Sequence, residues 1–133
     1  MIDRALVEAV FARAMPYERY LASDPARAGG WQAVHDRVRL TEAQRGEIAS
    51  FTREMKVLVV SGIWCGDCVQ QGPLLARIAE ANPRIDLRWV DRDVEADFSA
   101  RLIGAGVRRL SGGSRARSAT AARWPGCPAS WYR

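Results

Sequence analysis

Residues 57–68 read VLVVSGIWCGDC, an apolar run followed by two cysteines with two residues between them. The run Val57–Val60 is typical of a strand that is buried on both faces of a parallel sheet. A helix is predicted to follow it, so that Cys65 lies at the helix N-terminus and Cys68 lies one turn further on. Unpaired N–H groups and the helix dipole favour a thiolate at such a position. The stretch therefore predicts a site for thiol–disulfide exchange.

Each residue of this motif can be given a role in exchange, which needs one thiolate to attack and a second thiol to resolve the mixed disulfide. Cys65 is predicted to be the exposed attacker, and Cys68 the resolving thiol. Gly66 lets a substrate backbone approach closely, and Trp64 is expected to form an apolar rim beside the sulfur. The carboxylate of Asp67 should raise the pKa of Cys65 relative to a motif with a neutral dipeptide between the cysteines, which predicts a reductant or a weakly oxidising exchanger.

The segment before this motif, residues 1–55, is predicted to be mainly helical. Ile2, Leu6 and Val10 recur every four positions and indicate a helix over residues 2–14. A further turn is expected at 17–21, followed by a loop over 23–30 that includes two glycines. Trp31, Val34 and Val38 are then spaced to form one helical face. A capping box at Thr41 opens the last of these helices, which has Ile48, Phe51 and Met55 on one face.

After the motif, the pattern predicts helix, strand and helix again. Residues 65–81 are expected to be helical, with Leu74, Leu75 and Ile78 facing the core and Pro73 kinking the helix. Residues 85–90 form the next predicted strand, 91–93 a loop, and 95–103 a short helix that ends at Gly104. Short connections in the order β-α-β-α imply parallel strands joined by a right-handed crossover.

Residues 111–133 differ in composition from the rest of the 133-residue chain, since they contain no Val, Ile, Leu, Met, Phe, Asp or Glu. They are predicted to be disordered or weakly docked. The net charge of +5 comes mainly from this tail, because all 15 acidic residues precede it. We therefore do not expect nucleic acid as a partner. No apolar run is long enough to span a membrane and no secretory signal is visible, which predicts a cytoplasmic protein.

The strand, the Trp-Cys-x-x-Cys, Pro73 eight residues after Cys65 and the following β-α resemble the thioredoxin superfamily over about residues 56–110. With the preceding helices and the sequences at 61–68 and 90–93, the chain is similar to the bacterial "thioredoxin family protein" group. The resemblance implies a thioredoxin-like α/β fold with an N-terminal helical extension. It also implies dithiol exchange in cell redox homeostasis, with no cofactor other than the redox-active disulfide Cys65–Cys68. The partners would be a protein or small-molecule disulfide and an external thiol reductant.

Two positions depart from the thioredoxin pattern. Thioredoxins place a buried Asp six residues before the first Cys, where this chain has Val59. Ser111 stands where a cis-proline is expected, and no β-hairpin follows it. We interpret residues 111–133 as the product of a frameshift or an aberrant C-terminus that leaves the fold incomplete. An exposed strand edge would then favour dimers or aggregation, although the oligomeric state itself is not predicted.

Two other classes of function stay open. The chain could be a non-catalytic, truncated thioredoxin-like remnant or an interaction module that keeps the motif without a substrate groove. A zinc site would need four ligands, and Cys127 and His35 are the only soft candidates besides the motif. The other singled-out residues are assigned structural roles: His35 as a solvated or capped surface residue, Asp91 and Asp93 as a polar loop, Trp31 and Trp89 as core packing.

Overall fold

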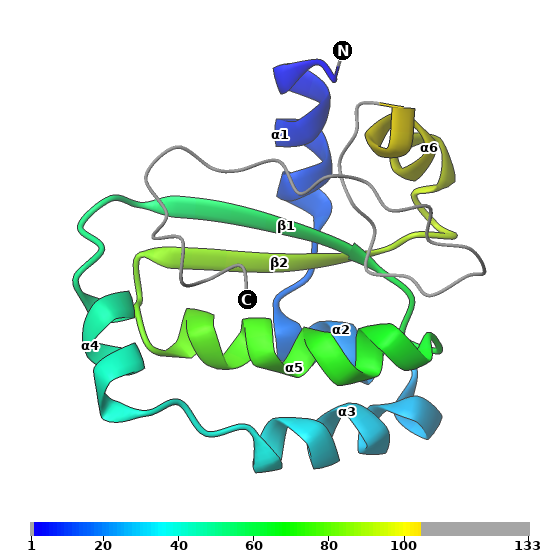
Figure 1. Ribbon diagram of the computed structural model, residues 1–133. Helices are drawn as coiled ribbons and strands as arrows, with labels where there is room; N and C mark the ends of the chain where they lie inside the picture. The colour runs from blue at the N-terminus through cyan, green and yellow to red at the C-terminus, as the bar shows by residue number, and fades with distance from the viewer. Residues whose placement is uncertain (1, 105–133) are drawn as a thin grey trace.

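The computed structural model describes residues 2–104, in which two parallel strands lie between helices (Figure 1). The elements are α1 (Arg4–Arg13), α2 (Tyr17–Ala22), α3 (Pro25–Arg37), α4 (Glu42–Ala49), β1 (Met55–Ser61), α5 (Gly66–Glu80), β2 (Ile85–Asp91) and α6 (Ala96–Gly104). The predicted order β-α-β-α and the preceding helices are confirmed. The predicted tail at 111–133, including Ser111 and Cys127, lies outside the described residues.

β1 and β2 pair in parallel, with Val59 opposite Trp89 near the centre of the register. Side chains alternate between the two faces of a strand, so each face can contribute to a different apolar cluster. Val57 and Val59 pack in a cluster with residues of α2, α3 and α5, whereas Leu58 and Val60 pack against a second cluster on the opposite face. The prediction that the Val57–Val60 run is covered on both faces is thereby confirmed.

The second cluster joins α1 and α6 to the sheet. Val10 and Ala14 pack with Val90 and Phe98, and all four side chains are buried. Figure 1 shows the resulting three layers, with α1 and α6 on one side of the strands and α2, α3 and α5 on the other. Within residues 2–104, no helix is long and apolar enough to cross a membrane.

Met15 connects the N-terminal helices directly to the sheet. Its backbone N–H donates to the carbonyl of Trp89 at 2.8 Å, and its carbonyl accepts from the N–H of Trp89 at 2.7 Å. This isolated antiparallel bridge occupies the edge of β2 that faces away from β1. At the opposite edge, no strand in the described part of the chain pairs with β1.

The predicted loop over 23–30 is wrong from Pro25 onward, because α3 begins there and contains Gly29 and Gly30. Pro25 occupies the first turn of this helix, where no backbone N–H is needed and its fixed φ suits the helical conformation. Gly30 packs near Val69 of α5, since a Cβ built on it would lie 3.7 Å from the Val69 side chain. Packing of α3 on α5 therefore overrides the weak helix propensity of the two glycines.

The capping box at Thr41 is confirmed, but the helix that it opens ends at Ala49 rather than continuing to Met55. Asn82 accounts for this early end. Its buried side-chain amide donates to the carbonyl of Ile48 at 2.8 Å and to that of Phe51 at 3.0 Å. The segment after α4 is thus held against the end of α5, and Met55 begins β1.

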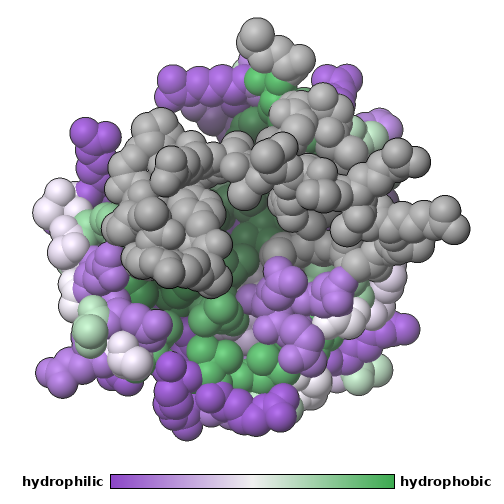
Figure 2. Space-filling model, in the orientation of Figure 1, coloured by the Kyte–Doolittle hydropathy of each residue, from purple (hydrophilic) through white to green (hydrophobic). Residues whose placement is uncertain are grey.

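The buried face of α5 also differs from the predicted one. Its buried residues are Cys68, Gly72, Pro73 and Ala76, whereas Leu74 is 43% exposed. Small residues on the inner face let α3 approach closely, and the larger Leu74 consequently points outward. In Figure 2, hydrophobic surface is visible where Figure 1 places α5, and hydrophilic surface borders it.

Candidate functional site

Cys65 is the N-cap residue of α5, at the junction that the sequence predicted. Its extended backbone (φ −81°, ψ 122°) changes the chain direction between the end of β1 and the helix. The Cys65 N–H donates to the carbonyl of Gly62 at 3.0 Å, and the Cys65 carbonyl accepts from Val69 at 3.0 Å. The turn after β1 and the first turn of α5 therefore fix the position of the Cys65 sulfur.

Both cysteines of the motif carry thiols, and both are buried. Cys68 is 0% exposed, as expected for a resolving thiol, but Cys65 is only 5% exposed, so the prediction of an exposed attacker is wrong. Cys65 is buried because it belongs to the same apolar cluster as Cys68. Gly66 is exposed beside it, and a Cβ built there would meet no atom within 4 Å. The Gly66 side is thus the open approach to the start of α5.

The environment of Cys65 favours its thiolate. Burial raises the pKa of the Cys65 thiol, but hydrogen bonds from the backbone and thiol of Cys68, the backbone N–H of Asp67 and the charge of Arg92 together lower it by more. The net lowering agrees with the thiolate predicted for a cysteine at a helix N-terminus. Asp67 acts on Cys65 through its backbone N–H, which is one of the unpaired donors at the helix start.

The environment of Cys68 has the opposite effect. The pKa of the Cys68 thiol is raised to about 11: burial is the largest cause and the neighbouring Cys65 adds to it, while a backbone hydrogen bond with Gly62 and the charge of Arg92 act in the opposite direction. The two thiols therefore differ: the pKa of Cys65 lies below that of an ordinary thiol and the pKa of Cys68 lies above it. This difference matches the attacking and resolving roles that the sequence assigned.

Trp31 supports the turn that carries Cys65, a role that the sequence did not predict beyond core packing. Its indole Nε1 donates to the carbonyl of Ile63 at 2.8 Å, and its side chain is fully buried. Gly72 makes room for the ring, because a Cβ at that position would lie 2.2 Å from Cζ3 of Trp31. The predicted core role of Trp31 is confirmed, and its hydrogen bond adds a link between α3 and the site.

The region below the two thiols is an aromatic cluster. Tyr20 stacks on Trp89 with ring centroids 5.5 Å apart, and Trp31 meets Trp89 edge to face at 5.6 Å. The Tyr20 hydroxyl is hydrogen-bonded to the buried Ser61 Oγ at 2.7 Å, and burial raises the pKa of Tyr20 well above its usual value. Cys68 belongs to the same apolar cluster and is fully buried in it, which explains why the pKa of its thiol is raised.

Trp64 and Arg92 lie together at the rim of the site. Trp64 is 47% exposed, and the guanidinium carbon of Arg92 lies 4.1 Å from its ring centroid. The sequence analysis assigned Arg92 only to a loop. The sequence could have indicated that Arg92 lies near the motif. Arg92 directly follows β2 and the motif follows β1, and the carboxyl ends of parallel strands lie at the same edge of a sheet.

The predicted polar loop begins one residue later than expected, because Asp91 is the last residue of β2 and Asp93 lies in the turn that follows. One carboxylate oxygen of Asp91 accepts from the N–H of Asp93 at 2.8 Å and from that of Val94 at 3.3 Å. This arrangement is a local turn in which a side chain replaces a backbone acceptor. Among residues 2–104, no group of three or more His, Cys, Asp or Glu side chains could hold a metal ion.

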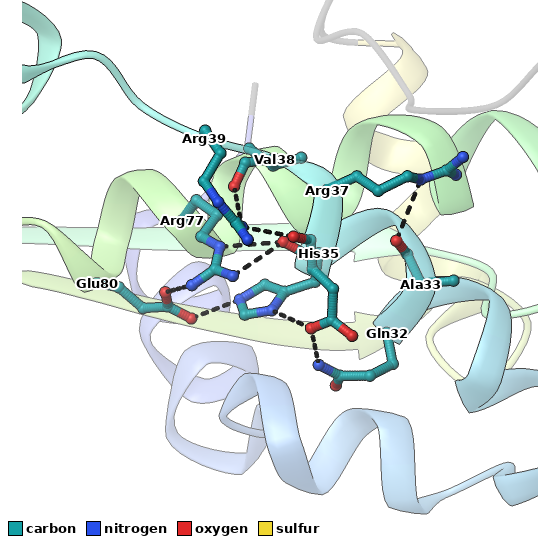
Figure 3. A network of polar contacts seen from close by, with 9 residues as sticks. Gln32, Ala33, His35, Arg37, Val38, Arg39, Arg77 and Glu80 are labelled. Carbon is teal, nitrogen blue, oxygen red and sulfur yellow. Dashed lines mark hydrogen bonds and ion pairs between the residues drawn. The ribbon is translucent and has the colours of Figure 1, made fainter.

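His35 is capped, although the imidazole is mostly buried rather than solvated, with 13% of its side chain exposed. Its Nε2 lies 2.7 Å from a carboxylate oxygen of Glu80, and its backbone carbonyl accepts two hydrogen bonds from Arg77 at 3.1 and 3.0 Å. Arg77 also pairs with Glu80 at 3.1 Å. Figure 3 shows this network, which ties the C-terminal part of α3 to α5.

A parallel α/β sheet with a Cys-x-x-Cys at the start of the helix after its first strand defines a thioredoxin-like protein. The sequence profile of the thioredoxin family matches residues 14–109. The chain therefore belongs to the thioredoxin family. The match begins at residue 14, so it includes α2, α3 and α4 as well as the strands.

Two solved structures share this fold. The crystal structure of a protein of unknown function from Pseudomonas aeruginosa has a TM-score of 0.67 and 17% sequence identity, and the match covers 82% of this chain. The crystal structure of an HIV epitope-scaffold has a TM-score of 0.65 and 16% identity over 77% of this chain. The chain spans 65% and 63% of the lengths of these two proteins. No curated protein matches the chain significantly.

Proposed function

We propose that this chain is a cytoplasmic thiol–disulfide oxidoreductase in which Cys65 attacks and Cys68 resolves. The observation that carries the proposal is the opposite environment of two thiols one helical turn apart. The pKa of Cys65 is lowered at the N-terminus of α5, whereas burial raises that of Cys68 to about 11. Family membership supports the same chemistry. A thiolate beside a protonated thiol is the starting state that dithiol exchange requires.

The proposed reaction has two exchange steps. The Cys65 thiolate attacks one sulfur of a substrate disulfide, the substrate S–S bond breaks, and a mixed disulfide forms while one substrate thiolate leaves. Cys68 loses its proton and attacks the Cys65 sulfur, which releases the second substrate thiolate and forms the Cys65–Cys68 disulfide. The substrate gains two electrons and the protein loses two. An external dithiol returns them and becomes a disulfide itself.

The proton of Cys68 needs an acceptor in the second step. Val59 occupies the position that an Asp holds in thioredoxins, and it is buried and apolar. The Tyr20 hydroxyl is hydrogen-bonded to Ser61 and its pKa is raised by burial, so it does not act as a base. We assign the acceptor role to the substrate thiolate that leaves in the first step. Resolution should consequently be slower with substrates whose leaving thiols are weak bases.

A redox titration of the full chain tests the proposal. Protein carrying Cys127→Ser is equilibrated across thiol/disulfide buffers, trapped with a mass-adding alkylator and weighed, and Cys65→Ser and Cys68→Ser in that background are the controls. We expect one two-electron transition with a defined midpoint that both controls lose. We also expect catalysed reduction of a protein disulfide by dithiothreitol, lost in Cys65→Ser.

The competing interpretation, a non-catalytic remnant or interaction module, predicts a different result. A broad titration like that of the urea-unfolded chain, together with no acceleration of disulfide reduction, would overturn the oxidoreductase proposal. A Cys68→Ser protein that accumulates a stable mixed disulfide would support the assigned order of attack. Accumulation in Cys65→Ser instead would reverse the two roles.

A further inference from the structure

We propose that Trp64 and Arg92 together form a specificity surface, here called the Trp64–Arg92 rim, that selects disulfides with negative charge near the sulfur. The inference rests on the proposed function, because it assigns a substrate class to the same site. It is carried by the position of these two side chains, the exposure of Trp64 and the charge of Arg92, which forms no ion pair within residues 2–104.

The position of the rim is fixed by contacts on both sides. The backbone N–H of Arg92 donates to the carbonyl of Ser61 at 2.9 Å, which holds the end of β2 against the end of β1. The Arg92 guanidinium carbon lies 4.1 Å from the Trp64 ring centroid, a cation–π contact. Gly62 lets the indole fold back, because a Cβ there would lie 3.0 Å from the Trp64 ring. Trp64 directly precedes Cys65, so the cation is held next to the nucleophile.

The charge of Arg92 is available to a ligand. Within residues 2–104, no carboxylate forms an ion pair with Arg92, whereas Arg13 and Arg88, for example, are paired with Glu95 and Asp86. The neighbouring Asp91 directs one carboxylate oxygen to two backbone N–H groups of its own turn. The Arg92 side chain therefore contributes to the site a positive charge that no carboxylate of residues 2–104 pairs with.

The rim offers two kinds of contact to a substrate. The exposed face of Trp64 can pack on the aliphatic part of a substrate, since 47% of this residue is exposed. The guanidinium can bind a carboxylate through two parallel hydrogen bonds, a geometry that a lysine does not provide. A partly buried cation acts on an anion in a medium of lower dielectric than water, so its effect exceeds that of a surface arginine. The preferred substrate is thus a carboxylate-bearing disulfide.

Three aliphatic disulfides that differ mainly in charge test this inference: 3,3′-dithiodipropionate, bis(2-hydroxyethyl) disulfide and cystamine. The second-order rate of mixed-disulfide formation at Cys65 is measured with the reduced full chain, in Cys68→Ser, Cys127→Ser protein. The pH is set above the Cys65 pKa of every variant, so that the thiolate fraction is equal and only substrate charge differs. Arg92→Gln removes the charge, and Arg92→Lys keeps it without the planar guanidinium.

Arg84→Gln is the matched control, because Arg84 is an exposed arginine just before the opposite end of β2. We expect Arg92→Gln to lower the rate ratio of the anionic to the cationic disulfide by roughly threefold to tenfold, as removal of one unit charge near the reacting atoms implies. Arg84→Gln should leave the ratio unchanged. Arg92→Lys should retain a ratio between those of the parent and Arg92→Gln, and added salt should reduce the parent's preference.

An unchanged ratio in Arg92→Gln, with the folded spectrum of the parent, would overturn the inference. An equal fall in all three rates would show that Arg92 acts only on the structure of the site and would overturn it as well. Should Arg92→Gln fail to fold, the comparison of Arg92→Lys with the parent and the salt dependence decide the question. Failure of the proposed function is distinguishable, because it concerns formation of the Cys65–Cys68 disulfide, which this measurement does not require.

Discussion

Replacement of Gly72 by alanine should destabilise the fold and disturb the site, because the Trp31 ring occupies the space that a side chain at position 72 would need. A Cβ at position 72 would lie 2.2 Å from Cζ3 and 2.7 Å from Cη2 of Trp31, far inside the roughly 3.5–4.0 Å of a normal carbon–carbon contact. The indole is fully buried and donates to the carbonyl of Ile63, so it has little freedom to retreat.

The size of the effect follows from three contributions. Overpacking of a buried contact costs about 1–3 kcal/mol. If the Trp31 ring shifts instead, loss of its hydrogen bond leaves the Ile63 carbonyl without its buried donor, at about 1–3 kcal/mol. Alanine recovers about 1 kcal/mol relative to glycine within a helix. Because the first two costs are alternatives, we expect Gly72→Ala to lower the free energy of unfolding by up to about 2 kcal/mol.

Urea unfolding monitored by far-UV circular dichroism measures this difference. Gly46→Ala is the matched control, because Gly46 lies inside α4 and a Cβ there would meet no atom within 4 Å. It should gain about 0.5–1 kcal/mol from helix propensity alone. A Gly72→Ala protein as stable as Gly46→Ala would refute the packing argument. A second test combines Gly72→Ala with Trp31→Phe, whose smaller ring should make the double substitution cost less than the sum of the single ones.

Three further predictions concern buried polar groups. Tyr20→Phe should lower the free energy of unfolding by roughly 1–2 kcal/mol in a urea titration, because the buried Ser61 hydroxyl loses its 2.7 Å partner, and an unchanged midpoint would contradict this contact. Asn82→Ala should cost about 1–3 kcal/mol in the same assay, since the carbonyls of Ile48 and Phe51 lose the Asn82 amide that donates to them, whereas a neutral effect would show that the segment is not held there. The pKa of Cys68 is about 11 in the folded chain and about 9 in an unfolded one, so folding favours the protonated thiol. The stability that this thiol contributes is fully present below pH 9 and is lost as the pH rises toward 11. Thermal unfolding from pH 8 to pH 11 should show this loss in the parent and less of it in Cys68→Ala.

Local signals in the sequence were sufficient for most of the fold. The apolar run at Val57–Val60 predicted a strand covered on both faces, and the capping box at Thr41 predicted where a helix begins. The helix end was predicted poorly. α4 ends at Ala49 because Asn82, more than 30 residues away in the sequence, donates hydrogen bonds to the carbonyls of Ile48 and Phe51. Similarly, Gly29 and Gly30 are helical because α3 packs on α5, which no local pattern reports.

By itself, the sequence determined the class of this protein. The spacing of Cys65 and Cys68, the apolar strand before them and the helix after them are properties of neighbouring residues, and they define a dithiol at a helix N-terminus. Only the tertiary structure decided the chemistry of that dithiol. The burial of Cys65, the net direction of its pKa shift and the Arg92 cation over Trp64 depend on desolvation and charge. Desolvation and charge act through space, between groups that only folding brings together.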